Sequence, residues 1–342
     1  MPARLGIGVL GLGSIGITHA RALRELGDLA ELRAFSGGSR QQAAEAGWPE
    51  AVQVAPEAVA RRPDIDLVAV CSPSDQHADQ ALAALEAGRH VVVEKPMALE
   101  VGAAERVVEA ARARGLSASV ISQRRFEPEY ATVERLVSDG DLGALRLATT
   151  HVHWWRDETY YASAPWRARM AAGGGSLMNQ GAHNVDLLLW LCGPVAEVTA
   201  QYGTLAHRMD AEDTTVATLR FASGALGLLS TSTATPPGSS ATVALHTARG
   251  AIELGQGQVL RWDVDGLPAP SEAGSGAASG AADPAAIGHR GHVAQWQNIL
   301  ESLHQGRTPK ISAEDGAAVV RLMCAVYEAA ESGRAVRPEE LA

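Results

Sequence analysis

The sequence predicts a two-domain α/β protein, in which a doubly wound parallel sheet is followed by an α+β domain with a large, mainly antiparallel sheet. The first observation is a glycine-rich turn, residues 11–16 (GLGSIG), which separates an apolar strand from a helix-like segment. The second is the alternation of strand-like and helix-like segments that continues as far as residue 122. The third is the change at Leu145, after which strand-like segments follow one another without long helices between most of them. We therefore expect domains at 1–122 and 123–342.

The first domain is predicted from short apolar runs bounded by turn residues. Leu5–Leu10 has the unbroken apolar character of a parallel strand buried on both faces, and a helix follows it up to Gly27. Further strands are expected at 31–36, 66–71, 90–93 and 117–121, and further helices at 76–88 and 101–115.

The glycine-rich turn has the GxGxxG spacing in the context that the motif requires, after a strand and before a helix. Gly11 would form the tight turn, Gly13 would let a diphosphate approach the backbone, and Gly16 would let the helix pack closely on the strand. The backbone N–H groups of Ser14 and Ile15, at the positive end of the helix dipole, would bind the phosphates. The motif predicts a dinucleotide cofactor.

The segment after the second strand bears on the choice of cofactor. Sites for NAD usually carry an acidic residue there, which binds the ribose 2′-hydroxyl. The segment 34–40 (AFSGGSR) contains no carboxylate, whereas Ser36, Ser39 and Arg40 are suited to a 2′-phosphate. The segment favours NADP over NAD, unless Arg40 simply begins the next helix in solvent.

The tripeptide Glu94-Lys95-Pro96 follows a predicted strand, at the sheet edge where open α/β sheets bind ligands. A lysine there is a candidate for polarising a substrate oxygen or carrying its proton, with a pKa adjusted by burial and by Glu94. The alternative is a Lys-Pro turn at the surface.

A mostly apolar segment, 176–193, predicts one continuous helix that carries a polar stripe. Asn179, His183 and Asp186 are spaced four and then three residues apart, so they would share a face. Gly181 inside the helix suggests that a flat group lies close to the backbone. The alternative is a buried structural helix whose histidine is hydrogen-bonded within the protein.

Strands of the second domain are expected at 145–154, 197–205, 214–221, 225–233, 242–247 and 251–254. The segment 268–286 is low in complexity and is predicted to be a mobile loop, either an inserted segment or a lid. The substrate-binding candidates combine aromatic rings with hydrogen-bonding groups, as suits a carbohydrate. They are Arg125, His153, Trp155, Trp166 and Arg167, together with Lys95, Asn179 and His183.

Two of these candidates, Arg125 and Arg167, are suited to a carboxylate or phosphate, which guanidinium groups bind in bidentate fashion. Packing on the sheet face is an equal alternative for Trp155. His151 and His153 alternate with Val152 and so share a sheet face, but no carboxylate lies nearby in the sequence, and we predict no metal site.

Composition limits the classes of partner and the location. The 342-residue chain has a formal net charge of −10, which argues against a nucleic-acid partner. Cys71, Cys192 and Cys324 are far apart without CxxC spacing, as expected of thiols in a reducing compartment. The chain shows neither an apolar run of about 18 residues nor a typical signal peptide. We expect a cytoplasmic protein without a membrane span.

Three motifs occur together in the order found in one enzyme family. GLGSIG opens the chain, residues 66–99 read DLVAVCSPSDQHADQALAALEAGRHVVVEKPMAL, and residues 173–193 read GGGSLMNQGAHNVDLLLWLCG. With these motifs the chain resembles the glucose–fructose oxidoreductase/inositol dehydrogenase/MocA (Gfo/Idh/MocA) family of NAD(P)-dependent oxidoreductases, and residues 288–337 are similar to that family's C-terminal helices. The resemblance covers nearly the whole chain.

The resemblance implies a Rossmann domain at 1–122 and a domain for substrate binding and oligomerisation at 123–342. An open-faced sheet in the second domain would pair with another subunit, giving a homodimer or homotetramer. The resemblance assigns catalysis to Lys95, His183 and Asn179. Beyond the glycine motif it implies these cofactor contacts: Ser72, Pro73, Ser74, His77, Glu94, Lys95, Pro96 and Gln123.

One position departs from the family pattern, because Asn179 stands where dehydrogenases of this family carry aspartate. An amide holds no charge and cannot raise the basicity of His183, so Lys95 would take more of the proton transfer. We expect a dehydrogenase or reductase for CH–OH groups of a carbohydrate, sugar or polyol. A redox-neutral glycosidase or isomerase with tightly held nicotinamide, and a non-catalytic cofactor sensor, are the alternatives.

Overall fold

A computed structural model describes residues 4–270 and 289–341, and the chain divides into two compact units. The first unit comprises Met1–Gln123 and His289–Val320, and the second comprises Arg124–Gly288 and Arg321–Ala342. The sequence assignment of all of 123–342 to the second domain is therefore wrong for 289–320. The physical reason is hydrophobic: Trp296 and Leu300 of helix α9 (Arg290–His304) belong to the same buried core as Ile7 of the first strand.

The first unit contains a six-stranded parallel sheet with the order β3-β2-β1-β4-β5-β6, which confirms the predicted doubly wound fold. Its strands are β1 Leu5–Leu10, β2 Ala30–Ser36, β3 Val52–Gln53, β4 Leu67–Val70, β5 His90–Val93 and β6 Ala118–Val120. Its helices are α1 Ser14–Glu25, α2 Arg40–Glu45, α3 Pro56–Val59, α4 His77–Glu86, α5 Val101–Arg114 and α9, and α10 (Ala313–Ser332) begins here and ends in the second unit.

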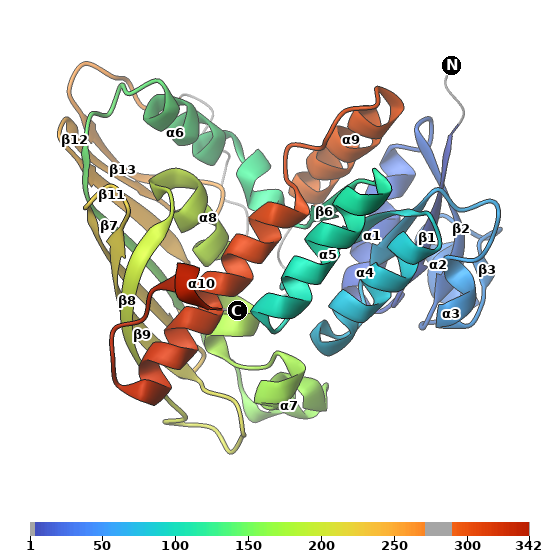
Figure 1. Ribbon diagram of the computed structural model, residues 1–342, viewed down its shortest axis with the longest axis horizontal. Coiled ribbons are helices and arrows are strands. Elements are labelled where there is room, and N and C mark those ends of the chain that lie inside the picture. The colour runs from blue at the N-terminus through green and yellow to red at the C-terminus, as the bar shows by residue number, and fades with distance from the viewer. Residues whose placement is uncertain (1–3, 271–288, 342) are drawn as a thin grey trace. The chain divides into compact units, whose positions relative to one another are not determined.

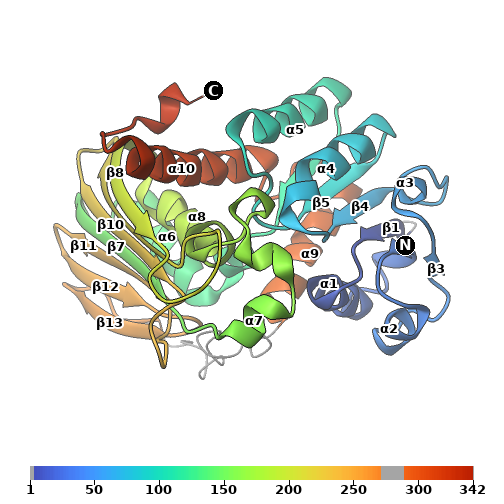
Figure 2. The same cartoon turned by 90° about the horizontal axis from the view of Figure 1, so that it is seen from below.

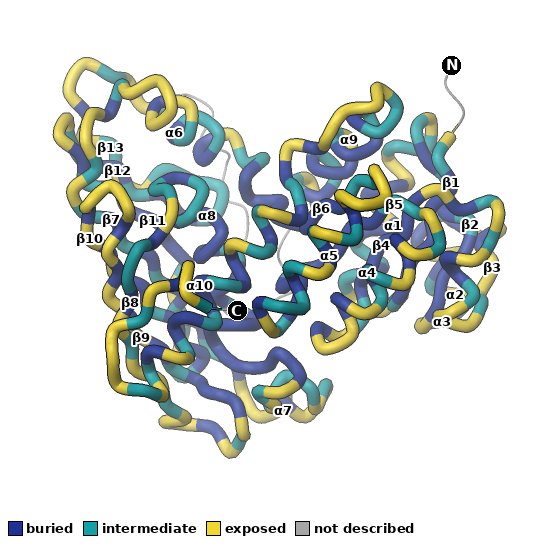
Figure 3. The backbone as a smooth tube through the Cα atoms, in the orientation of Figure 1, coloured by how far each residue is buried: buried dark blue, intermediate teal, exposed yellow. Residues whose placement is uncertain are grey.

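Alternate residues of β1 show how the sheet is covered. Ile7 and Val9 lie in the core cluster that includes residues of α1 and α9. Gly8, between them, faces Val59 of α3 on the other side. Helices α1 and α9 thus lie on one face of the sheet, and α3, α4 and α5 on the other (Figures 1 and 2). Strands β4 and β5 are buried, while the solvent side of α5 is exposed (Figure 3).

The second unit contains a seven-stranded sheet with the order β13-β12-β11-β7-β10-β9-β8. All neighbours are antiparallel except β7 and β10, which confirms the mainly antiparallel sheet. Strand β13 was not predicted. The strands are β7 Leu145–His153, β8 Val195–Gly203, β9 Thr214–Phe221, β10 Leu226–Ser232, β11 Thr242–Thr247, β12 Gly250–Leu254 and β13 Val259–Val264. The helices are α6 Pro128–Ser138, α7 Glu158–Ala162 and α8 Ala182–Cys192.

The two faces of this sheet differ. Helix α8 packs on one face, where the Asn184 side-chain amide donates to Thr150 Oγ1 at 2.9 Å. On the opposite face, Val216, Leu226 and Leu228 are 49%, 50% and 50% exposed. Strand alternation accounts for this division, since neighbouring residues point to opposite sides.

The predicted loop 268–286 lies almost entirely outside the described residues. Among the helices that the structure describes, none has the length and apolar character needed to cross a membrane.

Candidate functional site

The turn between β1 and α1 fits a diphosphate. Gly11 has a φ of +90°, and a Cβ there would lie 2.7 Å from the Cys71 carbonyl oxygen. A Cβ on Gly16 would lie 2.2 Å from the Gly11 oxygen, whereas a Cβ on Gly13 would meet nothing within 4 Å. No side chain caps α1, so the N–H groups of Ser14 and Ile15 stand at an open helix end. A dinucleotide fits this cradle.

The segment after β2 is built by backbone contacts. The Ser36 carbonyl accepts from the N–H groups of Gly11 and Leu12, at 3.0 and 2.9 Å. The Ser39 hydroxyl accepts from Gln42 N at 3.2 Å and so caps α2, while Arg40 is exposed at the start of that helix. The expected 2′-phosphate contacts therefore lie together on one turn, with Ser39 already used as a helix cap.

The loop after β4 is tied to the Lys95 segment by one histidine. His77 Nδ1 contacts the Pro96 carbonyl at 2.7 Å, and His77 Nε2 contacts the Ser72 carbonyl at 2.8 Å. Both ring nitrogens of His77 thus contact backbone carbonyls, and this histidine links the two loops that are predicted to line the cofactor site. Burial lowers the pKa of His77, against the effect of these two contacts.

Other predicted cofactor residues line the same sheet edge. Ser72 donates its hydroxyl to Gln80 Oε1 at 2.8 Å, and Pro73 precedes the short helix that Ser74 begins. Gln123 follows β6, and its Oε1 is buried and accepts no hydrogen bond from the described residues. An orphaned buried acceptor at the carboxyl end of a parallel sheet is consistent with a polar ligand there.

Lys95 follows β5 and is half-buried. Its backbone N–H donates to Glu94 Oε2 at 2.9 Å. Burial lowers the pKa of Lys95, and the opposing attraction of Glu94 does not cancel that effect. A lysine whose ammonium is easier to deprotonate than usual is suited to proton transfer.

The helix predicted over 176–193 consists of two parts. Ser176–Gly181 is a π-helix, and α8 follows it directly. Asn179 therefore lies in a wider helical turn than His183. The spacing of four residues, which assumes an α-helix, does not predict whether their side chains share a face. Asn179 is buried and His183 half-buried. Single π-helical turns inside α-helices occur frequently at functional sites.

A buried glutamate that the sequence analysis missed caps this π-helix. Glu212 Oε2 accepts from Ser176 N and Oγ, at 2.9 and 2.5 Å. Glu212 Oε1 accepts from Leu177 N at 2.9 Å and from Tyr327 Oη at 2.7 Å. Burial raises the pKa of Glu212, although all of these hydrogen bonds act to lower it.

Gly181 is required by packing within the unit. A Cβ there would lie 2.8 Å from Thr231 Cγ2 of β10 and 3.3 Å from Leu177 Cδ1. This close approach of the sheet accounts for the glycine and corrects the expectation that a flat ligand group requires it.

Tyr160 of α7 belongs to the same aromatic segment as the predicted substrate residues Trp155 and Trp166. Its hydroxyl accepts from Gln180 Nε2 at 2.7 Å and from Asn179 Nδ2 at 3.4 Å. The Arg167 guanidinium lies 4.2 Å above the Tyr160 ring centre, and Arg167 Nη1 donates to the Tyr160 carbonyl at 3.0 Å. Asn179, Tyr160 and Arg167 thus form one connected group.

Two predicted substrate residues lie elsewhere. Arg125 forms a buried bidentate ion pair with Asp186, at 2.9 and 2.6 Å, so its guanidinium is committed within the unit, as is the Asp186 carboxylate. His153 Nε2 contacts Ser230 Oγ at 2.8 Å on the sheet face opposite α8, because His153 alternates with Val152. The predicted substrate residues Arg125 and His153 therefore both have hydrogen-bond partners within this unit.

The predicted tryptophans occupy the segment that carries Tyr160. Trp155 is half-buried, with its ring centre 5.7 Å from that of His207. Trp166 is also half-buried, and the Arg167 guanidinium lies 5.9 Å from its ring centre.

Comparison with known families covers both units. Residues 5–122 match the oxidoreductase family with an NAD-binding Rossmann fold, and residues 130–253 match the GFO/IDH/MocA C-terminal domain. The chain belongs to the Gfo/Idh/MocA family. It is an NAD(P)-dependent oxidoreductase, which confirms the predicted family and enzyme class.

Individual members of the Gfo/Idh/MocA family align over almost the full chain. The scyllo-inositol 2-dehydrogenase (NADP(+)) IolW of Bacillus subtilis is 27% identical, covering 97% of this chain and 96% of its own. The myo-inositol 2-dehydrogenase of Thermotoga maritima is 26% identical, covering 98% and 99%. The structure of the WlbA dehydrogenase from Bordetella pertussis, in complex with NADH and UDP-GlcNAcA, has a TM-score of 0.86 at 30% identity, covering 98% and 99%.

Proposed function

We propose that the chain is a dehydrogenase or reductase that acts on CH–OH groups of a sugar, polyol or sugar derivative. The relatives named above act on inositols or were solved with a nucleotide sugar, which supports this class. The observation that carries the proposal is Lys95, half-buried at the carboxyl end of β5 with a lowered pKa, in the same unit as the open N-terminus of α1.

In this mechanism Lys95 donates a hydrogen bond to the reacting substrate oxygen and stabilises the charge that develops there. His183 acts as general acid or base, and Asn179 donates to or accepts from a substrate hydroxyl. The bound nicotinamide supplies or accepts the hydride. The Gly11–Gly16 turn and the open end of α1 hold the diphosphate through backbone N–H groups.

Substrate orientation is assigned to the Tyr160 group. Arg167 Nη1 is bonded to the Tyr160 carbonyl and to Ser163 Oγ, at 3.0 and 2.9 Å, and we propose that the remaining N–H groups of Arg167 bind a carboxylate or hydroxyl of the substrate. Trp155 and Trp166 are proposed to pack against sugar ring faces.

The assay that tests the function follows nicotinamide absorbance with NADP and with NAD, against a panel of polyols, aldoses and sugar acids. We expect turnover on one substrate class, lost in Lys95→Ala and in His183→Ala. Tight cofactor binding with no turnover across the panel would reject the dehydrogenase.

NADP is the proposed cofactor, with Ser36, Ser39 and Arg40 around the 2′-phosphate. Loss of one charge-assisted contact in Arg40→Ala should weaken NADP binding about 10- to 100-fold and leave NAD binding unchanged. Calorimetric titration with both cofactors measures this difference, and equal losses for NADP and NAD would reject the assignment.

The exposed face of the seven-stranded sheet is proposed to pair with a second copy, giving a homodimer or homotetramer. Leu147, Leu226, Leu228 and Thr218 line a shallow cavity of about 340 Å³ on this face. Leu228→Glu should shift sedimentation toward the monomer, because a charge would be buried in the contact. We further propose a cytoplasmic location, since the cysteines are free thiols and Cys71 is buried.

A further inference from the structure

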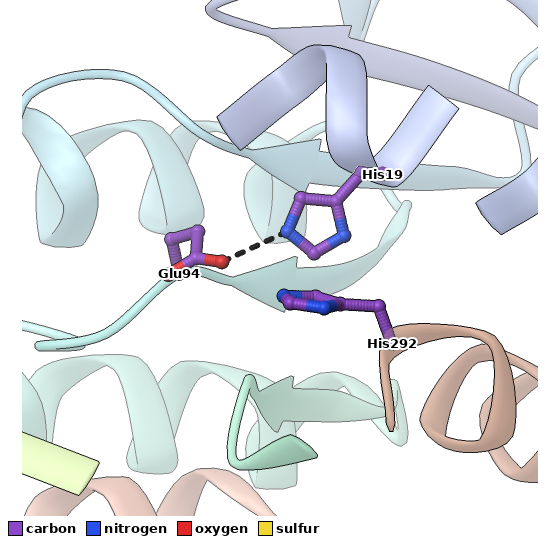
Figure 4. Close-up of side chains that lie close together, drawn as sticks. All are labelled: His19, Glu94 and His292. Atoms are coloured by element: carbon purple, nitrogen blue, oxygen red, sulfur yellow. Dashed lines mark hydrogen bonds and ion pairs between the residues drawn. The ribbon is translucent and has the colours of Figure 1, made fainter. Parts of the chain in front are cut away.

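Three buried titratable side chains converge beside the end of β5. His19 comes from α1, Glu94 follows β5, and His292 comes from α9 (Figure 4). They are 1%, 5% and 3% exposed, and one ligand-type atom from each lies within 4.8 Å of the others. The His19 and His292 rings meet edge to face with centres 5.1 Å apart. This spacing suits either three metal ligands or a chain of hydrogen bonds.

A tryptophan decides between these two arrangements. Trp296 of α9, which is fully buried, donates its indole N–H to His19 Nδ1 at 2.8 Å. An indole can only donate, so His19 Nδ1 must accept, and the neutral ring carries its hydrogen on Nε2. His19 Nε2 lies 2.9 Å from Glu94 Oε1 and donates to it. A metal at His19 Nε2 would have to displace that hydrogen and break this bond.

The chain of hydrogen bonds continues from Glu94 to the backbone of Lys95. Glu94 Oε2 accepts the Lys95 N–H at 2.9 Å, so the two carboxylate oxygens join His19 to the Lys95 peptide. Burial would raise the pKa of Glu94, but the His19 hydrogen bond and the charges nearby outweigh it, and the pKa is lowered. The carboxylate stays ionised and accepts on both oxygens.

His292 does not supply a second donor to this carboxylate. Burial and the proximity of His19 lower the pKa of His292 to about 3, so its ring is neutral at physiological pH. Neither ring nitrogen of His292 has a hydrogen-bond partner among the described residues. Five titratable side chains interact electrostatically with Glu94, namely His19, Lys95, Cys71, His77 and His292.

We propose that His19 and Trp296 are positioning residues for Lys95. Trp296 fixes the tautomer of His19, and His19 holds the Glu94 carboxylate against the Lys95 N–H. The catalytic consequence rests on the proposed role of Lys95, whereas the positioning itself does not.

Three variants test this chain of hydrogen bonds. His19→Leu removes the donor to Glu94, His19→Gln keeps a side-chain N–H, and Trp296→Phe removes the indole N–H. The first readout is amide hydrogen exchange of Lys95, followed by NMR. We expect exchange about tenfold faster in His19→Leu, as loss of one hydrogen bond predicts, and near-normal exchange in His19→Gln.

The second readout is the pH profile of turnover. In His19→Leu, Glu94 loses the His19 hydrogen bond that opposes its burial but keeps the charge of Lys95 nearby, so the acid limb should move up by about one unit or more, with turnover about 10- to 100-fold lower. His19→Gln should restore both. Trp296→Phe should have a smaller effect that disappears in the His19→Leu background.

Trp48→Phe is the matched control. The Trp48 indole is buried in the same core but donates to the Ala20 carbonyl at 2.8 Å, so its loss should leave the Lys95 amide and the pH profile unchanged. Unchanged Lys95 exchange in both His19→Leu and Trp296→Phe would overturn the proposal. So would one equivalent of zinc in the purified protein that His19→Leu loses. Normal turnover in Lys95→Ala with His19-dependent exchange would instead reject the proposed function and leave the positioning chain intact.

Discussion

A buried glutamate stands beside a candidate catalytic element in each unit, and the pKa values of the two are shifted in opposite directions. Glu94 joins His19 to the Lys95 peptide, and its pKa is lowered. Glu212 caps the π-helix that carries Asn179, and its pKa is raised. Both carboxylates lie in the interior and accept short hydrogen bonds.

The difference lies in the charge of the neighbours. Glu94 accepts a hydrogen bond from His19 and lies close to the charged Lys95, and together these favour the ionised carboxylate against the effect of its burial. The donors to Glu212 are backbone N–H groups and the neutral hydroxyls of Ser176 and Tyr327. Four neutral donors satisfy the oxygens of Glu212 without offsetting its loss of hydration. The number of hydrogen bonds therefore does not determine the direction of the pKa shift.

The largest effect is expected at the end of β5. Lys95→Ala should lower turnover roughly 10²- to 10⁴-fold, because a proton-transferring and charge-stabilising group is lost. Steady-state rates on the substrate found in the panel assay measure this loss. Lys310→Ala, which changes the other lysine of the chain, is the control and should be nearly neutral. Comparable rates for the two variants would show that the Glu94 region holds no catalytic group.

The cap of the π-helix should matter chiefly for stability. Glu212→Ala leaves several buried donors without an acceptor, so the free energy of unfolding should fall by about 3–5 kcal/mol. Urea unfolding followed by circular dichroism measures it. Glu331→Ala, at an exposed residue bonded to Tyr202, should change the free energy by less than about 0.5 kcal/mol. A Glu212→Ala loss below about 1 kcal/mol would mean that the cap is not needed.

A substitution at the other end of the π-helix should have a smaller effect on stability. Gly181→Ala places a methyl group 2.8 Å from Thr231 Cγ2, and overpacking of this kind lowers the free energy of unfolding by about 1–3 kcal/mol. Thr231→Ser removes that methyl and keeps the hydroxyl that meets Ser176 Oγ at 2.8 Å. The double variant should recover most of the loss. A more stable Gly181→Ala protein, as helix propensity alone predicts, would contradict the packing explanation.

The fold was predictable because its signals are local. An apolar strand before GLGSIG, and strands that alternate with helices, are properties of adjacent residues. The position of 289–320 was not predictable, since only the buried contacts of Trp296 with the core of β1 assign this segment to the first unit.

The site was predictable only in part for the same reason. Lys95 and the glycine turn stand in short motifs, whereas Glu212 reaches the helix start from 36 positions away in the chain. The Arg125–Asp186 pair spans 61 positions, and no local sequence pattern around either residue identifies its partner. The Glu94–His19 bond spans 75. Partners so distant in sequence decide which polar side chains are already satisfied, and so which are available to a ligand.

The smallest effect tests the comparison of the glutamates directly. A carboxyl whose folded pKa is lowered contributes stability above its unfolded pKa of about 4.3, and this is lost as the pH falls through the folded value. A carboxyl whose folded pKa is raised contributes below about 4.3, and its contribution is lost as the pH rises through the folded value. The stability of the wild type relative to Glu94→Gln should therefore rise with pH across the acid range. The stability of the wild type relative to Glu212→Gln should fall as the pH increases above about 4.

Urea midpoints measured from acid to neutral pH give both slopes, and Glu109→Gln, at an exposed position, should give a flat line. Slopes of the same sign would show that burial alone governs both carboxylates. Opposite slopes would show that the His19 hydrogen bond and the Lys95 charge outweigh the burial of Glu94, whereas the neutral donors of Glu212 do not outweigh its burial. In that case the carboxylate beside Lys95 remains charged over the whole range in which the lysine can exchange a proton.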